Sequence, residues 1–228
     1  STLFPYTTLF RSIIDMEDKT DLLIQIAPPP PLPHISAVPP GIKVVTWPQD
    51  LIHLYSVYGQ GSFDIFLFIF ARTDDNPYAS STAETPSFLE VLEEIASHDD
   101  SVTPLLKTIR SVEAWAVWGG TDDGDRCLWL APTGDLPERV VCVDSKCFEW
   151  SFHEMSVTSF LYSLLTRTVD CPVLVSGEGF PTCYADMQGV SRILGRTVST
   201  TEHFFLTPED SVKISENWND IGPEWRRA

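Results

Sequence analysis

Four short apolar segments separated by tight turns constrain the fold of this chain more than any other feature. They are Glu113–Trp118, Arg126–Leu130, Val140–Val143 and Phe148–Phe152. The acidic stretch that joins the first pair contains an Asp-Gly dipeptide, which accepts the positive φ that tight hairpin turns need. Parallel strands require connections of about a dozen residues or more, so strands joined this closely pair antiparallel. The sequence therefore predicts an antiparallel meander.

Apolar residues at helical spacing flank this meander on both sides. Residues 47–58 predict a helix before it, a second helix opens at Thr85, helical spacing resumes after Pro104, and Ser156 caps a last helix. The phenylalanine and isoleucine residues of 63–70 suit a single strand buried on both faces. The predicted fold class is α+β, an antiparallel meander sheet packed by N-terminal, middle and C-terminal helices.

The chain divides into four parts by composition. Thr2–Ser12 match the translation of a common sequencing-adapter oligonucleotide, so we expect residues 1–12 not to be native. Residues 13–36 are polar and then rich in proline, which removes amide donors, and they predict a disordered leader. Residues 37–170 form the α+β domain, and residues 171–228 form an extension packed on it, with a short helix and a short strand.

The charge and cysteine content exclude several classes of protein. There are 32 acidic and 15 basic residues, a net charge of −17, so the chain lacks the basic footprint that direct nucleic-acid binding requires. The longest strongly apolar run, Ile65–Ala71, is far shorter than the roughly 20 residues of a membrane span. The 5 cysteines include no Cys-x-x-Cys pair, which fits neither a disulfide framework nor a zinc ribbon and favours a reducing cytoplasm.

No residue pattern predicts a catalytic, cofactor or metal site. The acidic turn that begins at Asp122 lacks the glycine and the final glutamate of an EF-hand loop. Cys147 and His153 suggest a nucleophile and base, but no oxyanion-hole motif accompanies them. The remaining histidines lack His-x-x-x-His spacing, and neither a P-loop nor a Gly-x-Gly-x-x-Gly motif occurs. We therefore expect no enzyme, no cofactor and no bound metal.

Tryptophans and acidic residues mark a candidate surface for a protein partner. Large aromatic residues on a thin sheet fill the core or anchor a binding face. Strong negative charge beside them steers a chain toward a basic partner. The candidate contact residues are Trp118, Asp122, Asp123 and Asp125, with Asp74, Asp75, Asp99 and Asp100 as a second acidic set.

These segments together resemble the SUKH superfamily of the Smi/Knr type over about residues 37–168. The motifs that carry the resemblance are Val38–Pro40, Tyr58–Phe63, Phe66–Phe70, Trp118–Trp129, Val140–Val143, Trp150, Met155–Leu161 and Leu164–Leu165. Leu136–Arg139 departs from the Trp-Pro that related sequences often carry before the valine strand. The superfamily includes many bacterial immunity proteins and fungal regulators of cell-wall synthesis.

The resemblance implies a non-enzymatic domain that binds another protein, in bacteria often a toxin. Some toxins of this kind are nucleases with basic surfaces, which an acidic domain would block. A regulatory or scaffolding module of the same fold, without a toxin partner, is the alternative that the fungal relatives suggest. A hydrolase that uses Cys147 or His153 is a third, remote alternative.

Overall fold

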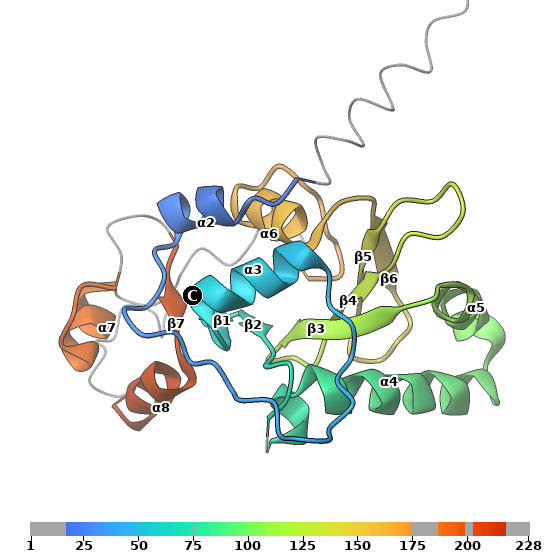
Figure 1. The fold of residues 1–228 in the computed structure, drawn as a ribbon, viewed down its shortest axis with the longest axis horizontal. Helices are drawn as coiled ribbons and strands as arrows, with labels where there is room; N and C mark the ends of the chain where they lie inside the picture. The colour runs from blue at the N-terminus through green and yellow to red at the C-terminus, as the bar shows by residue number, and fades with distance from the viewer. Residues whose placement is uncertain (1–16, 75, 175–186, 199–202, 218–228) are drawn as a thin grey trace, which may run out of the picture.

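The computed structural model describes residues 17–74, 76–174, 187–198 and 203–217. It is an α+β structure in which helices pack against a seven-stranded antiparallel sheet of order β6-β5-β4-β3-β2-β1-β7 (Figure 1). The strands are β1 (Gly61–Phe63), β2 (Leu67–Ile69), β3 (Trp115–Thr121), β4 (Arg126–Leu130), β5 (Arg139–Val143), β6 (Trp150–His153) and β7 (Phe205–Leu206). The expected foreign segment 1–12 lies outside the described residues.

The predicted meander is confirmed as strands β3 to β6. Each of these strands pairs antiparallel with the next, as the short connections required. Cys127 of β4 lies opposite Cys142 of β5, which in turn lies opposite Ser151 of β6, and Val140 lies opposite His153. Because directly opposite residues point to the same face of a sheet, Cys127, Cys142, Ser151 and His153 share one face.

Helices cover both faces of the sheet, and each face has its own apolar core. The helices are α2 (Thr20–Ile26), α3 (Gln49–Tyr58), α4 (Ser81–Ala96), α5 (Thr103–Ser111), α6 (Val157–Leu165), α7 (Met187–Leu194) and α8 (Pro208–Glu216). Helices α2, α3 and α6 cover what we call the α3–α6 face, and α4 and α5 cover the α4–α5 face (Figure 1). Strand alternation divides the core between them: Ala116 and Trp118 pack on the α3–α6 face, and Val117 packs on the α4–α5 face.

The single strand expected over residues 63–70 is instead a hairpin, so that prediction was wrong. Asp64 and Ile65 have φ of 55° and 60°, and they turn the chain between β1 and β2. Left-handed backbone is tolerated by aspartate but is costly for isoleucine. The Asp64 carboxylate holds the turn by accepting hydrogen bonds from the Phe204 N–H (3.0 Å) and the His203 ring (2.7 Å).

The leader expected to be disordered is ordered from residue 17 onward. Helix α2 buries Leu23 completely on the α3–α6 face, and the Tyr58 hydroxyl donates a 2.7 Å hydrogen bond to the Ala27 carbonyl. The apolar residues that precede the prolines thus supply a packing face. The prediction of disorder over residues 13–36 was therefore wrong for residues 17–36, and residues 13–16 lie outside the described residues.

The C-terminal segment completes the sheet. Helix α7 and strand β7 occur where the sequence predicted a helix and a strand, and α8 follows with a capping box between Thr207 and Asp210. Strand β7 pairs antiparallel with β1, so the last strand of the sheet in sequence forms one of its edges. Within the residues that the structure describes, no helix has both the length and the hydropathy needed to cross a membrane.

Candidate functional site

The acidic turn between β3 and β4 presents two of its three aspartates to solvent. Asp122 and Asp123 are exposed at its tip. Asp125 is half-buried, and its carboxylate accepts hydrogen bonds from the Thr121 hydroxyl (2.8 Å) and the Ser145 N–H (3.0 Å). Asp122 and Asp123 are therefore available to a partner, whereas Asp125 holds the turn against the β5–β6 connection.

The second acidic set does not join the first. Asp99 and Asp100 are exposed beyond the C-terminal end of α4, and the Asp99 carboxylate caps the next turn by accepting from the Ser101 N–H, which lowers its pKa. Glu84, in the first turn of α4, is bonded to Arg126 beside the acidic turn. The 16 residues of α4 span about 24 Å, so Asp99 and Asp100 lie at the opposite end of this helix from the acidic turn. Asp74 is half-buried, and Asp75 lies outside the described residues.

Trp118, which we expected to be an exposed anchor, is 0% exposed. Strand alternation points it away from Val117 and into the core of the α3–α6 face. Its indole Nε1 has no hydrogen-bond partner. The expectation that Trp118 contacts a partner was therefore wrong, and the residue is a core side chain.

An open pocket lies beside the acidic turn and brings an aromatic side chain to it. The pocket has a volume of about 460 Å³, and Phe68, Tyr78, Asp122, Arg126 and Ser211 are among the residues that line it. Tyr78 is 74% exposed, so its ring is available for contact. The Arg126 guanidinium is engaged by Glu84 at 2.9 Å. The pocket thus offers a free carboxylate and a free aromatic ring next to an arginine that is already paired.

Cys147 and His153, the suggested nucleophile and base, lie on different faces of the sheet. Cys147 packs in the core of the α4–α5 face, and burial raises the pKa of its thiol to about 11. His153 stacks against Phe160 of α6 on the opposite face, with ring centroids 4.8 Å apart. The two side chains therefore form no catalytic pair.

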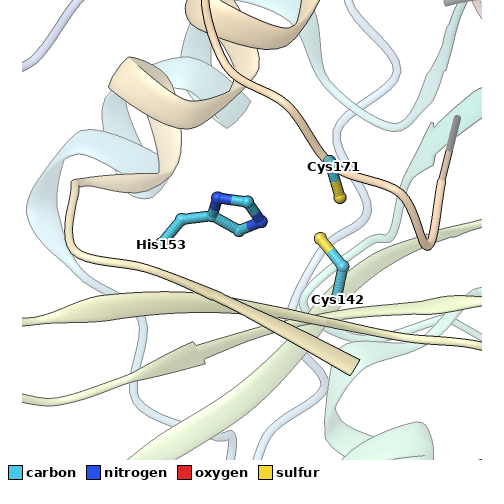
Figure 2. A group of neighbouring side chains, drawn as sticks. All are labelled: Cys142, His153 and Cys171. Carbon is cyan, nitrogen blue, oxygen red and sulfur yellow. The ribbon is translucent and has the colours of Figure 1, made fainter. Parts of the chain in front are cut away.

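His153 instead meets two other cysteines in the interior of the α3–α6 face. The ligand atoms of Cys142, His153 and Cys171 all lie within 4.8 Å of one another, and all three residues are buried. In Figure 2 a ring nitrogen of His153 points toward the two sulfur atoms. Cys142 comes from β5, His153 from the end of β6, and Cys171 from the segment after α6. We name these three residues the Cys–His cluster.

Two further side chains surround the Cys–His cluster. The Ser151 hydroxyl lies 2.9 Å from His153 Nε2 and 3.5 Å from Cys171 Sγ, and Cys127 Sγ lies 3.9 Å from Cys142 Sγ. Hydrogen bonds from Cys142, His153 and Ser151 outweigh burial and lower the pKa of Cys171 to about 4. Burial and the neighbouring sulfurs raise the pKa of Cys142. Cys171 is therefore the more acidic of the two thiols, and Cys142 is the less acidic one.

Sequence reasoning missed the Cys–His cluster because its members follow no motif spacing. Cys142 and Cys171 are separated by a strand and a helix, and the pattern around Cys171 is weak. The one available signal was the alternation that places Cys127 and Cys142 at inward positions of neighbouring strands.

Comparisons with protein-family models, with curated proteins and with solved structures gave no match to this chain. The resemblance to the SUKH superfamily therefore depends on the sequence motifs themselves, and it stays a prediction.

Proposed function

We propose that this chain is a non-catalytic protein-binding domain of the immunity type that neutralises a basic toxin in the cytoplasm. The observation that supports it best is the pocket at the β3–β4 turn, where Asp122 and Tyr78 lie beside a cavity of about 460 Å³. A lysine or arginine of the partner fits this chemistry, because the carboxylate pairs with its charge and an aromatic ring attracts a cation.

Charge on the whole molecule supports a basic partner. The net charge of −17 produces a negative field that accelerates association with a positively charged surface and weakens with added salt. Exposed aspartates at a turn then fix the register of the partner, while an accessible ring supplies buried area. In this proposal the charge of the whole surface attracts the partner, and the pocket makes the contacts that hold it.

The position of the suggested nucleophile supports a role without catalysis. Cys147 is a buried thiol on the α4–α5 face, and His153 is occupied in a cluster on the other face. The hydrolase alternative depended on these two residues acting together. A scaffolding role of the same fold would use the same surface, and the identity of the partner separates it from immunity.

The test is binding of the full chain to each protein encoded by the adjacent open reading frames, measured by surface plasmon resonance at low and physiological salt. We expect one basic protein to bind and its toxicity to be neutralised. Substituting Asp122→Asn and Asp123→Asn together should weaken that binding about tenfold, equivalent to about 1.4 kcal/mol. Tyr78→Ala should slow association little and speed dissociation.

The matched control is the pair Asp99→Asn and Asp100→Asn, which removes the same charge at the far end of α4. This pair should reduce the association rate slightly and leave the dissociation rate unchanged. Equal effects of the two double variants would contradict the pocket as the contact site. Absence of binding to every neighbouring gene product would overturn the immunity function itself.

A further inference from the structure

The Cys–His cluster has the ligand types and the spacing of a zinc site. Zinc is bound by thiolate sulfur at about 2.3 Å and imidazole nitrogen at about 2.0–2.1 Å, usually as a tetrahedron, so neighbouring ligand atoms are about 3.5–3.8 Å apart. The ligand atoms of Cys142, His153 and Cys171 all lie within 4.8 Å of one another without any ion. Adjustments of about 1 Å therefore convert this arrangement into a zinc-binding one.

Charge balance favours a divalent ion in this interior. An uncompensated charge in an apolar core is very costly. Two thiolates and a neutral imidazole cancel the two positive charges of Zn²⁺, so the occupied cluster carries no net charge. Cys127, 3.9 Å from Cys142 Sγ, fits this balance as a thiol that donates to the Cys142 sulfur rather than as a third anionic ligand.

The surroundings place a neutral hydroxyl and an open pocket beside the cluster. The Ser151 hydroxyl already lies within reach of both His153 and Cys171. Ser151 also lines an open pocket of about 340 Å³ together with Pro172 and Val173, which directly follow Cys171. This pocket therefore reaches Ser151, which lies beside the cluster.

Burial argues against catalysis by the same residues. Cys171 is 1% exposed and His153 is 8% exposed, whereas a nucleophilic thiolate needs an accessible, partly exposed environment to meet its substrate. Buried thiolate and imidazole ligands are typical of structural metal sites.

We propose that Cys142, His153 and Cys171 bind one Zn²⁺, which fastens the segment after α6 to strands β5 and β6. Two Zn–S bonds and one Zn–N bond form, both cysteines bind as thiolates and release to solvent any thiol proton they carry, and no electrons are transferred. The ion is structural, because it joins three elements that are distant in sequence. This inference is independent of the proposed function.

The experiment uses the full chain, purified with reductant and without chelator, and measures zinc content by mass spectrometry of the elements. The chain stripped of metal is then titrated with Co²⁺, whose visible spectrum reports tetrahedral thiolate ligation. We expect one Zn²⁺ per chain, one Co²⁺ bound per chain with a thiolate charge-transfer band, and displacement of Co²⁺ by Zn²⁺. Chelation should lower the melting temperature, because an ion that binds only the folded state stabilises it.

Changing a residue that only hydrogen-bonds to a metal ligand typically lowers metal affinity about 10–100-fold. Cys171→Ser and His153→Gln each remove a ligand itself, so each should lower the affinity at least about tenfold. The matched control is Cys147→Ser, which removes a buried thiol on the opposite face and should leave Co²⁺ binding and its spectrum unchanged. Circular dichroism establishes that each variant is folded. If the cluster variants fail to fold, the titration of the unmodified chain still decides the matter.

Three results would overturn the proposal. The first is that the unmodified chain binds neither ion in a one-to-one ratio. The second is that Cys147→Ser lowers the affinity as much as Cys171→Ser does. The third is that chain purified without reductant holds a disulfide between Cys142 and Cys171 and that reducing this bond restores no metal binding.

Discussion

The two faces of the sheet bury ionisable groups in different ways. On the α3–α6 face such groups lie inside the core, where the Asp50 carboxylate accepts from the Thr158 N–H at 2.8 Å and the Cys–His cluster lies between strands and α6. On the α4–α5 face the described core is aliphatic and aromatic around the Cys147 thiol, the buried Ser81 and Thr85 hydroxyls bond to the Val117 backbone, and the Glu84–Arg126 pair lies at the rim.

This difference indicates which face tolerates substitutions in its core. A core of aliphatic side chains tolerates exchanges of similar volume, because its contacts carry no direction. Buried polar groups need specific partners, and an unpaired member costs the full desolvation penalty. We therefore expect the α3–α6 face to respond to changes in pH and metal, and the α4–α5 face to respond mainly to changes in volume.

The largest effect should come from Trp118, the side chain that we had expected to be exposed. Trp118→Ala removes a fully buried indole from the α3–α6 face, and it should reduce the free energy of unfolding by about 3–5 kcal/mol. Urea denaturation measures this change. Phe148→Ala, which removes a 59% exposed ring, is the control and should change stability by less than about 0.5 kcal/mol. Equal losses in the two variants would contradict the burial of Trp118.

The second prediction compares the two faces by how their buried thiols make stability depend on pH. The measurements are made on metal-free protein in the presence of reductant. Cys171 has a folded pKa of about 4 against an ordinary value of 9.0, so its stabilisation is complete above pH 9 and is lost as the pH falls toward 4. The destabilisation caused by Cys171→Ser should therefore shrink as the pH falls from 9 toward 4.

Cys147 should show the opposite dependence on pH. Its folded pKa is raised to about 11, so its stabilisation is complete below pH 9 and is lost as the pH rises from 9 to 11. The stability difference between Cys147→Ser and the unmodified chain should therefore be constant below pH 9 and change above it. If the stability of Cys171→Ser and that of Cys147→Ser depended on pH in the same way, the proposed difference between the two faces would be wrong.

The smallest effects concern charge at the rim of the α4–α5 face. Glu84→Ala leaves the Arg126 guanidinium without its 2.9 Å partner in a mostly buried position, which should cost about 1.5–3 kcal/mol. Arg110→Ala breaks the 2.6 Å pair with Glu93, whose members are 58% and 43% exposed, and should cost about 0–1 kcal/mol. Thermal unfolding at two salt concentrations compares them. Strong salt dependence of the Glu84–Arg126 pair would show that it behaves as a surface pair.

The sequence predicted the parts of the fold in which short connections allow only one arrangement of the strands. Strands β3 to β6 followed from connections too short for a parallel crossover, and the Ser156 side chain caps α6 as expected by accepting from the Ser159 N–H. The hairpin at Asp64 and Ile65 was missed because its turn lies within a nearly continuous apolar run. Helix α2 was missed because the prolines that follow it dominated the composition of its segment.

The candidate sites were less predictable for a related reason. Trp118 was mistaken for an exposed side chain because β3 is covered by helices on both faces and is buried from Ala116 to Thr121, which the strand pattern alone does not show. The Cys–His cluster depends on where the chain passes after α6, which is a tertiary property. Exposure of Asp122 and Asp123, in contrast, followed from their place in a tight turn.

The pairing of β7 with β1 has a consequence for how the protein is made. Ser62 lies opposite Leu206, so a ribosome adding about 5–20 residues per second needs about 7–30 s after making β1 before its partner exists. During that interval the outer edge of β1 is an open template for other strands, and Asp64 lacks the backbone and ring donors of residues 203 and 204. Until β7 has been made, this edge of β1 is therefore a place where the nascent chain can aggregate.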